Sequence, residues 1–294
     1  MKKIFSISLI FVVIFFITGC GGNKESDKVK IVTSFYPMYI DAVNIAGNVF
    51  GVEVVNLTSP QTGCLHDYQL TTEDMKTLET ADIFIINGLG MESFLDKVTS
   101  ARSDLKIIDA SKSDDIYLIK DGDTPNPHVW MSITYSMNQV KAITKQLCEA
   151  DPEHANDYKR NALDYLERLT YLRDEMHLAL DNLPHKDIVT FHEAFPYFAA
   201  EFKLNIAAVI EREPGTEPTP QELAETIEKI NSLPVKVIFT EPQYSPKAAE
   251  TIARETGAQI FTLDPIVTGE ESPNAYIDAM MKNMLTLIKA LMVA

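Results

Sequence analysis

The 294-residue chain contains only three cysteines and comparatively little positive charge. Its 26 lysines and arginines stand against 42 aspartates and glutamates, which gives a net charge of −16. A surface of this sign repels nucleic acid and anionic lipid head groups, so neither is expected as a partner, whereas cations are attracted. Outside the N-terminus the sequence also lacks any run that is apolar enough to span a membrane.

The one long apolar run lies at the N-terminus, over residues 4–17, directly after Lys2 and Lys3. It is shorter than the ~20 residues that a helix needs to cross a bilayer. Basic, then apolar, then small residues are the order found in a secretory signal peptide, which we predict here. An uncleaved membrane anchor is the alternative.

The end of the run resembles the lipobox of bacterial lipoproteins, with the residues Ile17, Thr18, Gly19 and Cys20. The resemblance implies cleavage after residues 1–19 and lipidation of the Cys20 sulfur. Residues 20–29 are then a polar tether, because they lack apolar periodicity. Loss of two lysines with the signal peptide changes the net charge to −18.

Eight short runs rich in β-branched and aromatic residues alternate with helical stretches. Nearly all are continuously apolar, as expected for strands covered on both faces. Capping boxes at Thr71–Asp74 and Thr219–Glu222 mark two of the intervening helices. This alternation predicts an α/β fold with parallel sheets. The predicted strands are residues 30–35, 52–57, 81–88, 105–110, 187–191, 206–211, 235–241 and 258–264.

The pattern changes between the two sets of strands. Residues 153–183 contain no glycine or proline, and apolar residues recur there at spacings of three and four. One helix of about thirty residues would be ~45 Å long, which suits a rod between two lobes. We therefore predict two lobes, each a four-stranded mainly parallel sheet with flanking helices, joined by one long rigid helix. The predicted parts are an N-terminal lobe over residues 30–150, a linking helix over 151–184 and a C-terminal lobe over 185–294.

Four titratable side chains follow predicted strands. Ligands of open α/β sheets bind beyond the carboxyl ends of the strands. His192 directly follows one run and Asp264 ends another, while His66 and His128 lie in loops after two runs of the first half. We predict that these four side chains converge on a cleft between the lobes. The alternative for each histidine is a surface or hydrogen-bonded role.

The predicted donor set suits a metal ion. Neutral imidazoles and a carboxylate can form a tetrahedral zinc site, and three nitrogen donors fit Zn²⁺ better than Mn²⁺, Mg²⁺ or Ca²⁺. Copper and nickel would accept the same ligands on affinity alone. His154, His177 and His185 are assigned no metal role, because none of them follows a strand.

At these residues the sequence resembles the zinc-binding solute-binding proteins of bacterial ABC importers. The resemblance runs from about Lys30 to the C-terminus. It is carried, in order, by "VTSFYPMY", "HDYQLTTEDMKTLETADIFIINGLGMESFLDK", "NPHVWMS", "TFHEAFPYFAAEFKL", "FTEPQYSPKAAETIARETGA" and "FTLDPI". In that family three histidines ligate the metal, and they match His66, His128 and His192. A carboxylate matching Asp264 ligates in many members, whereas water or another acid does so in others.

Two details of the sequence bear on the metal. Manganese-type relatives often carry a glutamate at the third histidine position, so His192 favours zinc. Many zinc members have a long histidine-rich loop before the second ligand, but "SKSDDIYLIKDGDTPN" contains no histidine. No accessory zinc-collecting loop is therefore expected.

The resemblance implies an extracytoplasmic receptor that captures Zn²⁺ and delivers it to an ABC-type permease and ATPase, acting as a monomer. A manganese-binding homologue with the same role is the alternative. A zinc hydrolase is disfavoured, because the sequence has no HExxH or GxSxG motif. An adhesin has no support from particular residues. Cys64 and Cys148 could form a disulfide in an oxidising compartment, but nothing in the sequence places them together.

Overall fold

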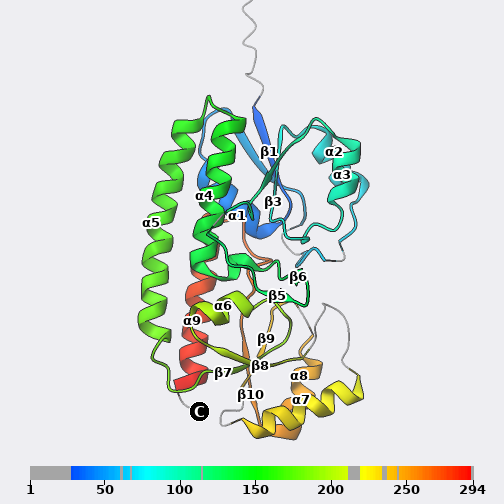
Figure 1. Cartoon of the computed structure of the whole chain (residues 1–294), viewed down its shortest axis with the longest axis vertical. Helices are drawn as coiled ribbons and strands as arrows, with labels where there is room; N and C mark the ends of the chain where they lie inside the picture. The colour runs from blue at the N-terminus through cyan, green and yellow to red at the C-terminus, as the bar shows by residue number, and fades with distance from the viewer. Residues whose placement is uncertain are drawn as a thin grey trace, which may run out of the picture.

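The computed structural model describes residues 28–59, 62–66, 68–113, 115–210, 219–233, 237–243 and 245–292. The predicted signal peptide, the lipidation site Cys20 and most of the tether lie outside these residues. Two four-stranded sheets form the body of the protein, one above the other in Figure 1. Every pair of neighbouring strands in both sheets is parallel.

The first sheet has the strand order β2-β1-β3-β4. Its strands are β1 (Val29–Thr33), β2 (Val52–Asn56), β3 (Ile83–Ile86) and β4 (Lys106–Asp109). The accompanying helices are α1 (Tyr36–Ala46), α2 (Thr72–Glu79), α3 (Leu95–Ala101) and α4 (Ile133–Ala150). The predicted capping box opens α2, where Thr71 and Asp74 bond reciprocally.

The second sheet has the order β10-β9-β7-β8. Its strands are β7 (Asp187–Thr190), β8 (Asn205–Val209), β9 (Val237–Thr240) and β10 (Gln259–Thr262). The helices are α6 (Pro196–Glu201), α7 (Pro220–Ser232), α8 (Lys247–Thr256) and α9 (Ala275–Met292). The second capping box, at Thr219 and Glu222, opens α7 as predicted. Two parallel four-stranded sheets with flanking helices confirm the predicted fold class.

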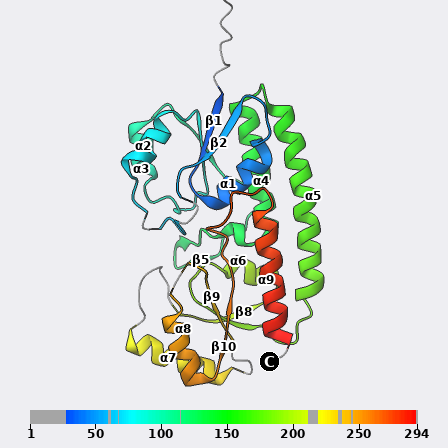
Figure 2. The same cartoon turned by 180° about the vertical axis from the view of Figure 1, so that it is seen from behind.

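The long helix between the sheets is α5 (Ala155–Leu180), which has 26 residues. It is ~39 Å long at 1.5 Å per residue and runs beside both lobes in Figures 1 and 2. Its buried face packs on α1, α4 and α9. The helix is shorter than the predicted span of residues 151–184. A turn at residues 152–154 precedes it, and Asp181 is its C-cap residue.

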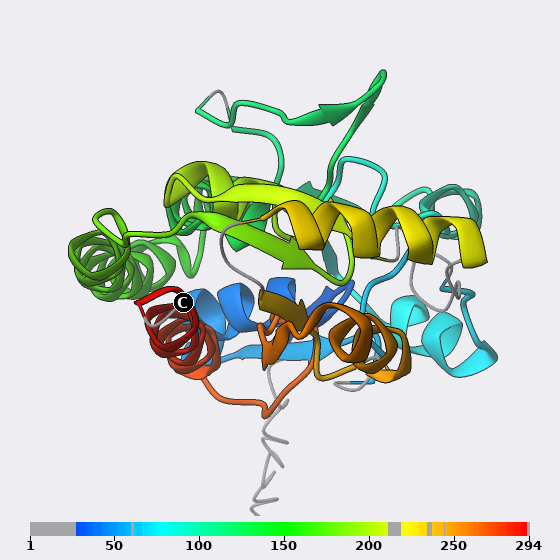
Figure 3. The same cartoon turned by 90° about the horizontal axis from the view of Figure 1, so that it is seen from below.

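The sequence did not predict a short hairpin between β4 and α4. It consists of β5 (Lys120–Asp121) and β6 (Thr124–Pro125), and a 3-10 helix, η1 (Val129–Met131), follows it. Figure 3 shows the hairpin projecting from one side of the body. The hairpin is important for the site because its second strand leads into His128.

The two lobes share buried contacts. One hydrophobic core contains residues of both sheets. The Trp130 Nε1 donates a hydrogen bond to the Pro265 carbonyl at 2.8 Å, and the Tyr276 hydroxyl donates to the Trp130 carbonyl at 2.7 Å. Among the described residues, none of the helices combines the length and the apolarity that crossing a membrane requires.

Candidate metal-binding site

The three histidines predicted as ligands lie together between the lobes, and a cysteine joins them. One donor atom from each of Cys64, His66, His128 and His192 lies within 4.8 Å of the others. The Nε2 atoms of His66 and His128 are 3.4 Å apart, and the Cys64 Sγ lies 3.6 Å from His128 Nε2. His128 and His192 are buried, whereas Cys64 and His66 are partly exposed. The cluster therefore has an inner pair and an outer pair of donors.

The outer pair comes from the loop between β2 and α2. Leu65, which separates Cys64 from His66, is fully buried in the hydrophobic core. This anchor holds the loop against the sheet while its two neighbours face the other donors. A turn bond from the Tyr68 N–H to the Leu65 carbonyl, at 3.1 Å, keeps the segment compact.

His128 is oriented by Asn126. The Asn126 Oδ1 lies 3.0 Å from both the backbone nitrogen and the Nδ1 of His128. An amide oxygen only accepts, so Nδ1 carries the hydrogen and Nε2 presents its lone pair to the cluster. The Asn126 Nδ2 in turn donates to the Glu193 carbonyl at 2.9 Å, next to His192. One asparagine thus connects the ligand of one lobe to the ligand segment of the other.

His192 is oriented by a buried carboxylate. Its Nδ1 lies 3.0 Å and 3.2 Å from the two Glu241 oxygens, and its backbone N–H donates to the same carboxylate at 3.2 Å. Glu241 directly follows β9, and His192 lies two residues beyond the end of β7. A carboxylate that holds the Nδ1 hydrogen leaves Nε2 for a metal and raises the basicity of the imidazole.

The pKa values of the inner pair move in opposite directions. Burial lowers the pKa of His128 well below its usual value, and the neighbouring His192 and His66 lower it further. Burial also acts to lower the pKa of His192, but hydrogen bonds with Cys64 and Glu241 outweigh it and raise that pKa to about 10. His128 is therefore neutral and ready to bind, whereas His192 must release a proton to a metal.

Asp264, the fourth predicted ligand, is not part of this donor group. Its Oδ1 accepts a hydrogen bond from the Ile266 N–H at 2.8 Å, and the Gln243 side chain also bonds to it. The carboxylate lines a different cavity of about 230 Å³, next to Tyr36. The structure places Cys64 with the three histidines instead, and a ligand role for Asp264 remains a prediction.

The other histidines have local partners or lie elsewhere. The His154 Nδ1 is 2.7 Å from Asp151, and the His177 Nδ1 is 3.0 Å from Asp181. Both pairs lie near the ends of α5, and His185 follows that helix. Within the described part of the chain, none of these histidines belongs to a cluster of possible metal donors.

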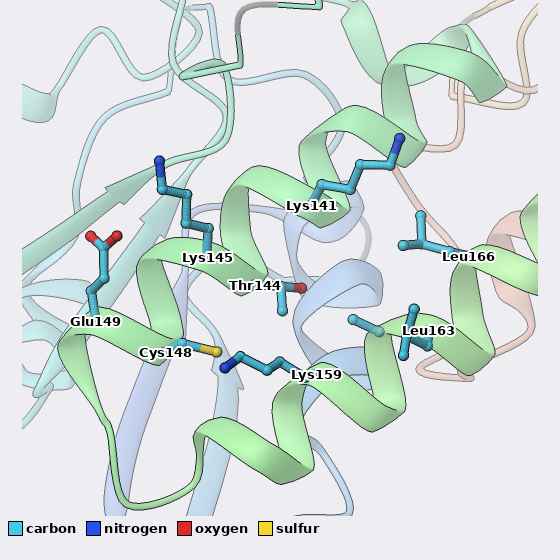
Figure 4. Close-up of a pocket in the computed structure, with 9 residues that line it drawn as sticks. Lys141, Thr144, Lys145, Cys148, Glu149, Lys159, Leu163 and Leu166 are labelled. Carbon is cyan, nitrogen blue, oxygen red and sulfur yellow. The ribbon is translucent and has the colours of Figure 1, made fainter.

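Cys148 lies away from the cluster, on α4, and forms no disulfide with Cys64. It lines an open groove of about 590 Å³ between α4 and α5, which Figure 4 shows with Lys141, Lys145 and Lys159 around it. The two cysteines therefore have separate surroundings, and the disulfide considered from the sequence is absent from the structure.

Sequence reasoning missed two residues of the site, Cys64 and Glu241. The rule that ligands lie just beyond strand ends, which selected His192, would also have selected Glu241. His192 directly follows the predicted strand over residues 187–191, and Glu241 directly follows β9. Cys64 lies two positions before His66, a spacing that lets both side chains reach one point. From the sequence alone, the Cys64 thiol was expected only as a possible disulfide partner of Cys148.

The architecture and the donor cluster together define a class of protein. Two parallel α/β lobes, connected by a long helix, enclose imidazole donors that come from both lobes. This is the arrangement of a metal-binding solute-binding protein of ABC transport. Such a protein binds its cargo where the two lobes meet.

The family follows from comparison with known sequences. The family described as "ZnuA: Zinc-uptake complex component A periplasmic" matches residues 31–290. This chain therefore belongs to that family, as the sequence resemblance predicted. Its members are metal-binding transport receptors and not enzymes.

Individual relatives differ in the metal that their names state. The manganese-binding lipoprotein MntA of Halalkalibacterium halodurans is 26% identical over 302 residues, which cover 99% of both chains. The zinc-binding protein AdcA of Streptococcus pyogenes is 28% identical over 318 residues, but this chain spans only 61% of its length. The structure of FpvC from Pseudomonas aeruginosa in complex with Mn²⁺ matches with a TM-score of 0.81 at 32% identity, covering 90% of this chain and 98% of FpvC.

Proposed function

We propose that this protein captures Zn²⁺ between its lobes, outside the cytoplasm, and delivers it to the permease and ATPase of an ABC importer. His66, His128 and His192 are the ligands that carry the proposal. They come from three distant segments, and their donor atoms lie within 4.8 Å of one another. This convergence is the observation on which the proposal depends.

The distances fit a single zinc ion. Nitrogen ligands lie ~2.0–2.1 Å from Zn²⁺, so two of them at the tetrahedral angle are ~3.3–3.4 Å apart. The Nε2 atoms of His66 and His128 are separated by 3.4 Å. Asn126 and Glu241 hold the Nδ1 atoms of His128 and His192, so the Nε2 atom of each ring is the one left for the ion.

Manganese is the second candidate, because MntA is named as a manganese-binding protein and matches nearly the whole chain. Mn²⁺ prefers shells rich in oxygen. The donor cluster offers nitrogen and sulfur atoms, while the predicted oxygen ligand, Asp264, bonds to Ile266 and Gln243. This donor set favours zinc over manganese as the cargo.

The proposal includes the position of the protein in the cell. Lipid on Cys20 would anchor the chain at the outer face of a membrane, and residues 20–29 would tether the lobes to it. A lipid-anchored monomer stays close to its permease, which raises the effective concentration of the captured ion there. The predicted boundaries of the two lobes and the linking helix are part of the same proposal.

The test is a zinc titration in competition with a chromogenic chelator, on wild type, His192→Ala and His185→Ala. We expect one tightly bound Zn²⁺ in wild type and at least a tenfold weaker affinity in His192→Ala, because a donor is lost. His185→Ala removes a histidine outside the cluster and should match wild type. Identical curves for all three proteins would refute the proposed ligands.

A further inference from the structure

We infer that Cys64 supplies a thiolate as the fourth ligand, so that the site is a Cys–His₃ tetrahedron selective for zinc over manganese. This inference rests on the proposed function and specifies how the same site chooses its metal. It assigns to Cys64 the place that the sequence analysis gave to Asp264.

The first support is the distance from the sulfur to a neighbouring ligand. Zn–S and Zn–N bonds of ~2.3 Å and ~2.0–2.1 Å, at the tetrahedral angle, separate the sulfur from the nitrogen by ~3.6 Å. The Cys64 Sγ lies 3.6 Å from the His128 Nε2. The same calculation reproduces the 3.4 Å between the Nε2 atoms of His66 and His128. Two different kinds of ligand pair therefore agree with one ion at one centre.

The second support is the position of Cys64 within the group. Its donor atom lies within 4.8 Å of the donors of all three histidines, and its side chain also hydrogen bonds with His192. Cys64 forms no disulfide with Cys148. Three imidazoles and one sulfur complete the four positions that zinc prefers.

The third support is that the competing carboxylate is engaged elsewhere. The Asp264 Oδ1 accepts the Ile266 N–H at 2.8 Å, and Ile266 itself has φ 59, which is unusual for a β-branched residue. Moving Asp264 into the site would remove the hydrogen bond that holds this strained turn. The Asp264 backbone nitrogen is also fixed, since it donates to the Asn283 Oδ1 at 2.8 Å.

The chemical consequence is selectivity. Thiolate is a soft ligand that binds Zn²⁺ well and Mn²⁺ poorly, whereas a carboxylate in the same place would accept both. On binding, the Cys64 S–H bond breaks, the S–Zn bond forms and the proton leaves to solvent. The exchange requires no oxidant or reductant.

Cobalt provides a direct test, because Co²⁺ takes the same ligands and its absorption reports them. We expect the metal-stripped, reduced wild type to bind Co²⁺ with tetrahedral d–d bands and a sulfur-to-cobalt charge-transfer band in the near-ultraviolet. Cys64→Ser should keep the d–d absorption but lose the charge-transfer band. Cys148→Ser, the matched control on α4, and Asp264→Asn should retain both.

The outcomes separate this inference from the proposed function. Cobalt bound by wild type without a charge-transfer band would overturn the thiolate ligand and leave the histidine site standing. Failure of wild type to bind either Co²⁺ or Zn²⁺ would overturn both. In competition titrations, Cys64→Ser should lose at least tenfold in zinc affinity while its manganese affinity changes little. An unchanged ratio of zinc to manganese affinity would also overturn the inference.

Discussion

Glu92 offers a test of how the first lobe supports the site, through the effect of pH on stability. The carboxylate is buried, and it accepts hydrogen bonds from Ser34 Oγ at 2.8 Å, the Asn87 N–H at 2.8 Å and the Gly88 N–H at 3.1 Å. Ser34 and Asn87 directly follow β1 and β3, so Glu92 connects two strand ends. The Asn87 side chain then donates to the Pro127 carbonyl, next to His128.

The size of the effect follows from the pKa of Glu92. Burial raises this pKa from 4.5 to about 7, although the three hydrogen bonds partly oppose the rise. The folded protein therefore holds this proton more tightly than the unfolded chain does. Stability from this group is fully present below pH 4.5 and is lost as the pH rises through about 7. At ~1.36 kcal/mol per pKa unit, the loss is about 3 kcal/mol.

Glu92→Gln removes this ionisation and also changes one hydrogen bond. The amide oxygen can still accept from Ser34 and Asn87, but the amide nitrogen cannot accept from the Gly88 N–H, which costs about 1 kcal/mol. We therefore expect Glu92→Gln to be about 1 kcal/mol less stable than wild type at pH 4 and about 2 kcal/mol more stable at pH 8. The two stability curves should cross at about pH 5.

Urea unfolding of the metal-free proteins, followed by circular dichroism from about pH 4 to about pH 8.5, measures this difference. Glu228→Gln makes the same change on an exposed face of α7 and serves as the control. Its difference from wild type should stay small across this range, because the side chain is exposed. A difference between Glu92→Gln and wild type that does not change with pH would contradict the raised pKa and the reasoning built on it.

Two further substitutions test the carboxylate that orients His192 and a hydrogen bond between the lobes. Glu241→Gln should weaken zinc binding by about 10–100-fold, because it replaces the carboxylate that orients His192. Competition with a chelator at fixed pH measures this loss, and an affinity equal to that of wild type would contradict the orienting role. Trp130→Phe should lower the free energy of unfolding by about 1–3 kcal/mol, because the buried Pro265 carbonyl loses its donor. Thermal or urea unfolding checks this value, and no loss would mean that the carbonyl finds another donor.

Most of the fold could be predicted from the sequence, because the inner strands β3 and β9 are buried along their whole length. Runs rich in β-branched and aromatic residues mark all eight strands, and the capping boxes mark the starts of α2 and α7. The hairpin of β5 and β6 could not be predicted in the same way. Each of its strands has two residues, which is too short for any hydrophobic period to be visible.

The site was predictable only in part, for a related reason. His192 directly follows a strand, so its position is local information. His66 lies ten residues beyond β2, and His128 follows a hairpin, so their meeting point depends on how the loops pack. The proposed fourth donor also depends on how the loops pack. Leu65 anchors the loop that carries Cys64, and the hydrogen bond from the Ile266 N–H holds Asp264 in its own loop.

The contacts around the donors also indicate how the ion is held. The inner pair of donors, His128 and His192, is buried and is connected through Asn126 and the backbone of Glu193. These bonds exist before any ion arrives, so binding requires little rearrangement of the inner pair, which favours tight capture. The outer ligands belong to one partly exposed loop between β2 and α2. Displacement of that single loop would remove two donors at once while the lobes stay packed. We expect the ion to be released to a permease by this movement.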